Sequence, residues 1–332
     1  MSRIPSVRDI AGEVTATILA RLEAGILPWA RSWSLTGEGG RPLRHEGTPY
    51  SGINTLWLWA TADMRGYRSR YWMTARQAGE LGGCIRPGAC PSMSIYASVF
   101  RKPGQPMLTG ESAARFIRFL RSYAVYNADE IDGLPAWYYP RDVPPTPALL
   151  SQRQDAIDAF FTAIPARVRH GGDEAYYCPG TDRIQLPHPG SFASGDAYAS
   201  TRGHETAHWS GAPARLARTF GKRFGDRAYA MEELTAELTA SMICADLGLP
   251  TSLHDSHASY VSHWMTVMRA DTSAIFTAAA RAEQAFAYLR GFSTPAAGEQ
   301  KAPPQANRKY RPRSRPDPFH PQQGDPSWDG CS

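Results

Sequence analysis

Two histidines and a glutamate at short spacing are the residues of this sequence that point most directly to a chemistry. His204, Glu205 and His208 form an H-E-x-x-H pattern inside a stretch with helical character. Residues four apart lie on one face of a helix, so both imidazoles can bind one Zn²⁺ while Glu205 lies beside it as a general base. Zinc lowers the pKa of a bound water to about 7, and Glu205 would accept the proton as the water attacks a carbonyl. The pattern predicts a hydrolase of peptides or proteins, with Zn²⁺ or another divalent metal as cofactor.

A catalytic zinc site needs a third protein ligand and one open position. The extended H-E-x-x-H-x-x-G-x-x-H pattern is excluded because Ala214 stands where its last histidine would be. Glu233 and Glu237 lie four residues apart in an apolar helical stretch, where like charges destabilise a helix unless a positive group lies against them. We predict Glu233 as the third ligand and Glu237 as the acid that orients a histidine, with the reverse assignment open. Without a metal, the pair would lie on a solvated face or meet Arg223 or Arg227.

The elements that must position these groups are a helix over about 196–209 and a second helix over 231–247, which Gly248 ends. A strand at 183–186 precedes the first helix closely enough to be the edge that orients an extended peptide. Three tyrosines are candidate donors to an oxyanion: Tyr176, Tyr177 and Tyr198. The other elements predicted in this half are a helix at 151–164, strands at 166–170 and 175–178, and one or two helices over 256–289.

The N-terminal half has a different pattern. Apolar residues recur every four positions from Ile10 to Leu22, which is typical of an amphipathic helix over 7–24. A long irregular connection over 28–52 follows. The other elements predicted here are helices at 51–65 and 75–81, the second capped by Thr74, and strands at 92–100 and 116–127. Helices and strands in both halves predict an α+β fold class.

Prolines mark the boundary between two predicted domains. Four prolines lie within eight residues from Pro140 to Pro147, so we predict a linker over 136–150. The predicted parts are an N-terminal domain at 1–135, a C-terminal domain at 151–291 and a disordered basic tail at 292–332.

Charge is distributed unevenly between the halves. Residues 1–130 hold 16 Lys and Arg against 10 Asp and Glu, whereas residues 131–291 hold 14 against 17. The basic half is therefore a candidate partner for phosphate backbones. The 5 cysteines include no C-x-x-C pair, and their odd number argues against a disulfide framework, which indicates a reducing compartment. Since the N-terminus lacks a signal-peptide pattern and no apolar run is long enough to span a bilayer, we expect a cytoplasmic protein without a membrane partner.

The basic half also interleaves arginines with aromatic residues. Single-stranded DNA is held by a positive groove and by aromatic faces on which bases stack, each stack contributing about 1–3 kcal/mol. Trp57 and Trp59 fall on a predicted helix and are assigned to the core. The residues expected to contact DNA are Trp29, Arg31, Trp33, Arg44, Tyr50, Asn54, Arg65, Tyr67, Arg68, Arg70 and Trp72. We predict binding without sequence preference, because phosphate contacts carry no sequence information.

Short blocks in both halves resemble the ArdC-type antirestriction proteins. In the C-terminal half the blocks are Tyr176–Tyr177, Thr181–Pro187, Phe192, Gly203–Gly211, Arg215–Leu216, Phe224–Gly225 and Tyr229–Leu238. In the N-terminal half they are Leu22–Gly25, Pro28–Trp29, Trp33, Tyr50–Asn54, Gly66–Tyr67, Trp72–Thr74, Gln77–Ala78 and Leu81–Gly83, followed by Tyr126–Asn127 and Gly133–Leu134. The blocks run in order over roughly residues 7–290.

This resemblance implies an N-terminal domain that binds single-stranded DNA and a C-terminal zincin-like metallopeptidase domain. It implies carriage on a plasmid or phage, protection of incoming DNA from host restriction, and a metal at His204, His208 and a downstream acid. Ala30 and Ser32 replace the family's usual basic residue and proline, which weakens the expected DNA contact at this point. Two alternatives stay open: a DNA-binding protein whose zincin domain is a non-catalytic scaffold, or a metallopeptidase that DNA binding merely localises.

Overall fold

The residues that the structure describes form helices and three sheets, which confirms the predicted α+β class. This computed structural model describes residues 7–29, 40–101, 116–140, 146–221, 226–250 and 258–293. Arg31, Trp33, Arg223 and the predicted tail beyond Ser293 lie outside these ranges.

Two helices of the N-terminal half bury apolar faces. Helix α1 (Val7–Glu23) has the predicted apolar stripe, and Ile18 on this stripe is fully buried. Helix α2 (Ile53–Arg65) is buried over most of its length. Trp57 and Trp59 on α2 are both buried, which confirms their assignment to the core.

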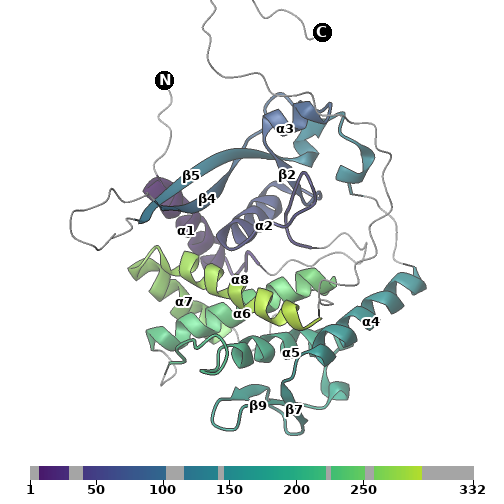
Figure 1. Ribbon diagram of the computed structural model, residues 1–332, viewed down its shortest axis with the longest axis vertical. Helices are drawn as coiled ribbons and strands as arrows, with labels where there is room; N and C mark the ends of the chain where they lie inside the picture. The colour runs from purple at the N-terminus through teal and green to yellow at the C-terminus, as the bar shows by residue number, and fades with distance from the viewer. Residues whose placement is uncertain are drawn as a thin grey trace, which may run out of the picture. The chain divides into compact units, whose positions relative to one another are not determined.

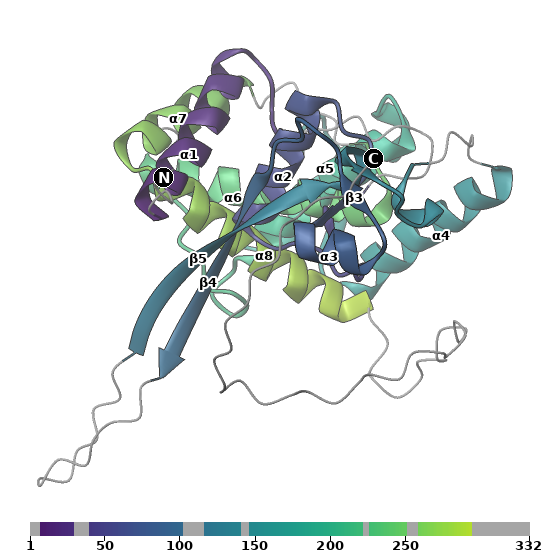
Figure 2. The same cartoon turned by 90° about the horizontal axis from the view of Figure 1, so that it is seen from above.

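The largest sheet has the strand order β1-β2-β5-β4. Its strands are β1 (Leu43–Arg44), β2 (Tyr71–Met73), β4 (Ser92–Arg101) and β5 (Phe116–Asn127). Strand β1 lies within the stretch predicted to be irregular and pairs in parallel with β2, while the other pairs are antiparallel. Figure 2 shows β4 and β5 as a ribbon that extends beyond the helices. The Asn54 amide on α2 binds the backbone N–H and C=O of Ile95 on β4, each at 2.7 Å.

A smaller core lies around β2. Helix α3 (Ala75–Glu80) begins with a capping box between Thr74 and Gln77, as predicted for Thr74. Strands β3 (Cys84–Ile85) and β6 (Ile131–Asp132) pair beside it, and 3₁₀ turns form at Ala128–Glu130 and Ala136–Tyr138. The buried residues of this core are Met73, Ala78, Ala128, Ile131, Leu134 and Tyr138. Tyr138 is thus a core residue, although it falls in the stretch predicted as a linker.

The C-terminal half opens with a helix and a small sheet. Helix α4 (Pro147–Ala163) starts before the predicted Ser151, because the Thr146 hydroxyl accepts a hydrogen bond from the Leu149 amide and caps it. The strands are β7 (Arg167–His170), β8 (Tyr176–Cys178) and β9 (Arg183–Leu186), in the order β7-β9-β8, and a 3₁₀ turn at Pro189–Ser191 follows. The prediction that the strand at 183–186 is a free edge is wrong. Both sides of β9 are paired, and β8 is an edge strand.

Four helices complete this half, and Figure 1 shows α5, α6 and α8 side by side. They are α5 (Gly195–Ser210), α6 (Arg227–Leu247), α7 (Ala258–Ala270) and α8 (Ala274–Ser293). Helix α6 begins earlier than predicted because Asp226 caps its first turn. All residues from Ala230 to Ala245 are buried, so α6 is the central helix. In the described ranges, no helix combines the length and the apolar character needed to cross a bilayer.

Side chains from the two halves share one core. The rings of Trp29 and Trp264 lie 6.0 Å apart. Arg41, which is 7% exposed, forms an ion pair of 2.6 Å with Glu283 on α8 and lies over the ring of Phe286. The Gly52 amide donates to the same Glu283 carboxylate at 2.9 Å. Polar as well as apolar contacts therefore hold the two halves together.

Replacement of Glu283 by alanine is expected to lower the free energy of unfolding by about 2–4 kcal/mol, because it leaves the buried Arg41 guanidinium without its anion. The measurement is urea denaturation of the full chain. A matched control is Glu80→Ala, which breaks the Arg76–Glu80 pair on α3, where both side chains are exposed. That change should cost less than about 0.5 kcal/mol, and equally small effects at both sites would contradict the prediction.

Candidate metal centre

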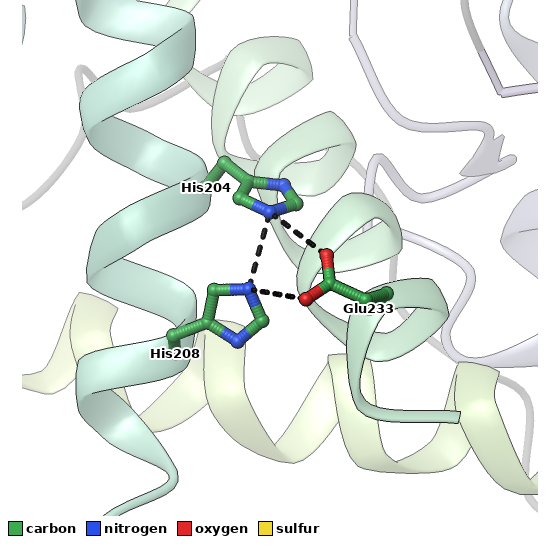
Figure 3. Close-up of side chains that lie close together, drawn as sticks. All are labelled: His204, His208 and Glu233. Carbon is green, nitrogen blue, oxygen red and sulfur yellow. Dashed lines mark hydrogen bonds and ion pairs between the residues drawn. The ribbon is translucent and has the colours of Figure 1, made fainter. Parts of the chain in front are cut away.

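Helices α5 and α6 bring the three predicted ligands to one point, as Figure 3 shows. His204 and His208 project from one face of α5, with their Nε2 atoms 3.2 Å apart. Glu233 faces them from α6, with one carboxylate oxygen 3.6 Å from His204 Nε2 and the other 3.6 Å from His208 Nε2. The three side chains are only 10–11% exposed. Among the described residues, this is the group of His, Cys, Asp and Glu side chains suited to hold a metal ion.

The separations fit a single metal ion. Three atoms bound to Zn²⁺ at about 2.1 Å with tetrahedral angles lie about 3.4 Å from one another. The two Nε2 atoms lie 3.2 Å apart and each has a different Glu233 oxygen at 3.6 Å, and one ligand atom from each of the three residues can be chosen so that all lie within 4.8 Å of one another. Glu237 instead lies 3.6 Å from Nδ1 of His204, so the geometry favours Glu233 as the third ligand, although the assignment stays a prediction. Arg227, one alternative partner of the acids, pairs with Asp271 at 2.5 Å.

Carboxylates of α6 also lie beside the outer nitrogens of both imidazoles. Glu237 lies 3.6 Å from Nδ1 of His204, and Glu232 lies 3.2 Å from Nδ1 of His208. Such partners fix the tautomer and the ring orientation of a metal-binding histidine. Glu232 was not among the predicted site residues, although it directly precedes Glu233. Its signal was the presence of three acids in one apolar helix, but only the packing of α5 on α6 shows which acid meets which ring.

Arg218 holds Glu232 in place. Its guanidinium donates to both carboxylate oxygens of Glu232, at 2.8 and 2.9 Å. It also donates to the Ser210 hydroxyl at 2.9 Å and to the Ala207 carbonyl at 2.6 Å. A Cβ atom at Gly211 would lie 2.7 Å from this guanidinium, so the glycine is needed for the close approach of Arg218. Gly211, which follows the H-E-x-x-H pattern, therefore leaves room for the Arg218 guanidinium and is not part of a pattern with a third histidine.

The carboxylates make this centre attract positive charge. Burial lowers the pKa of His208, but hydrogen bonds with Glu232 and Glu233 outweigh it and raise that pKa to about 9. Burial also lowers the pKa of His204, yet Glu233 and Glu237 hold it well above its ordinary value. Burial raises the pKa of Glu233, and the two histidines reverse this and hold it far below the usual range. A divalent cation would supply the positive charge that these carboxylates favour.

The metal centre opens into an acidic cleft of about 660 Å³. Its carboxylates are Asp173, Glu174, Glu205, Glu232 and Glu233. No lysine or arginine is among the described residues that line it. The edge strand β8 forms one wall through Tyr176 and Tyr177. Such a cleft repels a phosphate backbone, and its free strand edge can pair with an extended peptide.

Two tyrosines outside the predicted set also line this cleft. Tyr229 on α6 and Tyr260 on α7 have their hydroxyl oxygens 3.0 Å apart. Burial, the hydrogen bond with Tyr260 and the charge of Glu233 raise the pKa of Tyr229. The Tyr229 phenol therefore keeps its proton and can donate a hydrogen bond.

The tyrosines predicted as oxyanion donors lie in different places. Tyr176 lines the cleft and is half exposed. Tyr177 also lines it, but its hydroxyl donates to Asp182 at 2.8 Å. Tyr198 is not among the residues that line the cleft, and its hydroxyl pairs with Nε2 of His170 at 2.9 Å. Of the three predicted tyrosines, only Tyr176 lines the cleft with a hydroxyl that is not described as bound to another side chain.

Three aromatic side chains predicted to contact DNA lie in the core instead. Trp29, Tyr50 and Trp72 are 0%, 5% and 1% exposed. Protein atoms cover their faces because these large rings fill the interior that the two halves share. Asn54 is occupied by the backbone of Ile95. In this conformation none of these four side chains offers a base a binding surface.

The predicted arginines have more open positions. Arg44, Arg65 and Arg68 are exposed, whereas Tyr67 and Arg70 are half-buried. Arg68 and Arg70 line the same small pocket. The arginines expected to contact phosphate thus have positions at or near the surface, and among the described aromatic residues of the prediction only Tyr67 is partly exposed.

Comparisons with known proteins match both halves. Residues 8–126 match the family model of the N-terminal domain of the anti-restriction factor ArdC, and residues 155–281 match that of a zincin-like metallopeptidase. The chain is 38% identical to the antirestriction protein ArdC of plasmid R388. Its metal-free crystal structure gives a TM-score of 0.71 over 86% of this chain and 98% of that chain. The Mn(II)-bound crystal structure of the same protein gives a TM-score of 0.68 over 86% of this chain and 99% of that chain.

Two further relatives differ in length. The uncharacterized protein y4eC of Sinorhizobium fredii is 36% identical over 283 residues, which cover 83% of this chain and 90% of the relative. A DNA primase TraC of Escherichia coli is 33% identical over 306 residues, which cover 87% of this chain but 28% of the primase. The primase is therefore a much longer protein that contains a region similar to this chain.

Replacement of Glu232 by glutamine is expected to weaken divalent-metal binding about 10- to 100-fold, because the partner that orients His208 loses its charge. The affinity can be measured by competition with a chromophoric chelator. Asp182→Asn is a matched control, since Asp182 pairs with Arg215 but is not among the residues that line the cleft. An equal loss of affinity in both variants would contradict the role of Glu232.

Proposed function

The chain belongs to the family of ArdC antirestriction proteins, and from this premise we propose that it binds single-stranded DNA without sequence preference and protects DNA of an incoming plasmid or phage from host restriction. It would act in the cytoplasm, where restriction meets incoming DNA. The observation that best supports the proposed DNA binding is that positive and negative side chains lie on different surfaces. Arginines lie at the surface of the N-terminal half, and the metal cleft is lined by acids. A phosphate backbone is attracted to the first surface and repelled by the second.

The second part of the proposal is hydrolysis of a peptide bond at the metal centre. His204, His208 and Glu233 would hold the cation. When bound, it would act as a Lewis acid that polarises the substrate carbonyl and acidifies a water. Glu205 lines the cleft next to these ligands, so it can accept the proton of the attacking water and pass it to the leaving amine. The Tyr229 hydroxyl would donate to the developing oxyanion. Metal analysis decides between Zn²⁺ and another divalent ion, such as the Mn(II) of the R388 relative.

Two rival functions use the same fold. In the first, the zincin-like domain is a scaffold without turnover, and DNA binding alone protects. In the second, the protein is a peptidase that DNA binding only brings to its substrate. Glu205 at the cleft supports turnover, because a scaffold requires metal ligands but no general base.

Replacement of Glu205 by glutamine is expected to leave metal content and DNA affinity unchanged and to reduce peptide cleavage about 10²- to 10⁴-fold, because the general base is lost. The variant is compared with the wild type for bound metal, cleavage of a peptide mixture, and survival of an incoming plasmid in a restricting host. Unchanged protection would place the function in DNA binding. Loss of protection with DNA binding intact would place it in the peptidase. A metal-loaded wild type without cleavage would favour the scaffold.

Affinity for a labelled single-stranded oligonucleotide is expected to fall steeply as salt rises, with a logarithmic slope of about −0.7 for each phosphate contact. The reason is the release of counterions when arginines replace them along the strand. Fluorescence anisotropy at several salt concentrations measures the slope, and strands of different sequence should give similar values. Binding that is indifferent to salt would contradict this mode of recognition.

A further inference from the structure

Trp137 stands out at the surface of the N-terminal half. Its side chain is 63% exposed, more than any other large hydrophobic side chain among the described residues. Burial of an indole ring stabilises the folded state, and an exposed indole does not contribute this stabilisation. Exposure of this kind is a sign of a binding surface when polar groups suited to a ligand lie around it.

The neighbours of Trp137 hold it in this position. Tyr138 is buried, and its hydroxyl donates to the His45 carbonyl at 2.7 Å. The Tyr139 hydroxyl donates to the Ile131 carbonyl at 2.7 Å. The Trp137 and Tyr138 rings lie 5.7 Å apart with a tilt of 36°. Because the two following residues are anchored, the exposed indole lies on a fixed support and loses little freedom when a ligand binds.

Arginines lie beside this ring. Arg68 and Arg70 line one pocket together with Trp137, and no acid is among its described lining residues. The Ser69 hydroxyl donates to the Tyr138 carbonyl at 2.6 Å, which joins the arginine segment to the tryptophan segment. The pocket measures about 140 Å³, smaller than the roughly 300–1,000 Å³ that drug-sized ligands occupy. Its size and charge suit one planar base or one phosphate group.

An acid bound to the arginine segment does not remove this positive character. One carboxylate oxygen of Asp129 accepts hydrogen bonds from the backbone amides of Arg68 and Ser69, at 2.5 and 2.9 Å. The amide groups therefore partly offset its charge, and Asp129 is not among the described residues that line the pocket.

We propose that Trp137, Arg68 and Arg70 form a site for one nucleotide unit of single-stranded DNA. The base stacks on the indole face, and an adjacent phosphate binds the guanidinium of the exposed Arg68, with Arg70 adding positive charge beside it. The site rests on the proposed DNA binding and supplies an aromatic surface that the buried Trp29 and Trp72 do not. Stacking of this kind accepts every base, in keeping with binding that has no sequence preference.

The first test compares variants of the full chain for binding of a fluorescein-labelled oligothymidylate by anisotropy at low salt. Trp137→Ala should raise the Kd about 5- to 100-fold, and Trp137→Phe, which keeps an aromatic face, should raise it less. Tyr96→Ala is the matched control, because it removes another exposed aromatic ring of the same half, 50% exposed, and should leave the Kd unchanged.

The second test separates stacking from phosphate contact. Arg68→Ala should reduce the magnitude of the salt slope by about 0.7, whereas Trp137→Ala should leave the slope unchanged. Arg76→Ala removes the same charge from an exposed position on α3 and should alter neither slope nor Kd.

The outcomes distinguish this site from the proposed function. A wild type that binds the oligomer, with Trp137→Ala no weaker than Tyr96→Ala, would overturn the site and leave DNA binding intact. A wild type that fails to bind at low salt would overturn both. Free thymidine monophosphate shares the same chemistry and should bind much more weakly than the oligomer. Equal affinity would identify a mononucleotide site and overturn the assignment to a DNA strand.

Discussion

Three carboxylates inside the buried stretch of helix α6, residues 230–245, are the constraint on which this structure depends. Glu232, Glu233 and Glu237 lie on α6, where unpaired charges would be strongly destabilising. The two histidines of α5 lie against these acids, and Arg218 closes the group from the other side. The packing of α5 on α6 and the close approach of the chain after α5 follow from this need for positive partners. A divalent metal ion at the same point would take the place of the two imidazolium protons as the positive partner, because a histidine binds a metal in its neutral form.

The molecule keeps surfaces of opposite charge apart. Acids line the metal cleft, and the pocket beside Trp137 carries arginines without acids among its described lining residues. Electrostatics would therefore direct the proposed DNA strand and the proposed peptide substrate to different places. The proposed DNA site and the proposed peptidase site need not compete, and one chain can hold a strand while its cleft stays open.

Two regions with separate family matches share a continuous interior. Trp29 packs near Trp264, and Arg41 reaches Glu283 on α8, a helix that also contacts α6. The large rings of the N-terminal half are therefore used for packing against the helices that support the metal centre. The aromatic groups of the proposed DNA site would have to lie outside this interior, and the anchored segment after β6 exposes Trp137 in this way.

Local pattern in the sequence determined the α+β class, the helix that carries His204 and His208, the apolar helix with its acids, and the Thr74 cap. These features depend on spacing of a few residues, which the chain alone specifies. The tertiary structure decided that Glu232 faces His208, that β9 is the central strand and β8 an edge strand, and that Trp29 and Trp72 are buried. Each of these features depends on contacts with residues outside the local segment, and the spacing of residues within one segment does not specify such contacts.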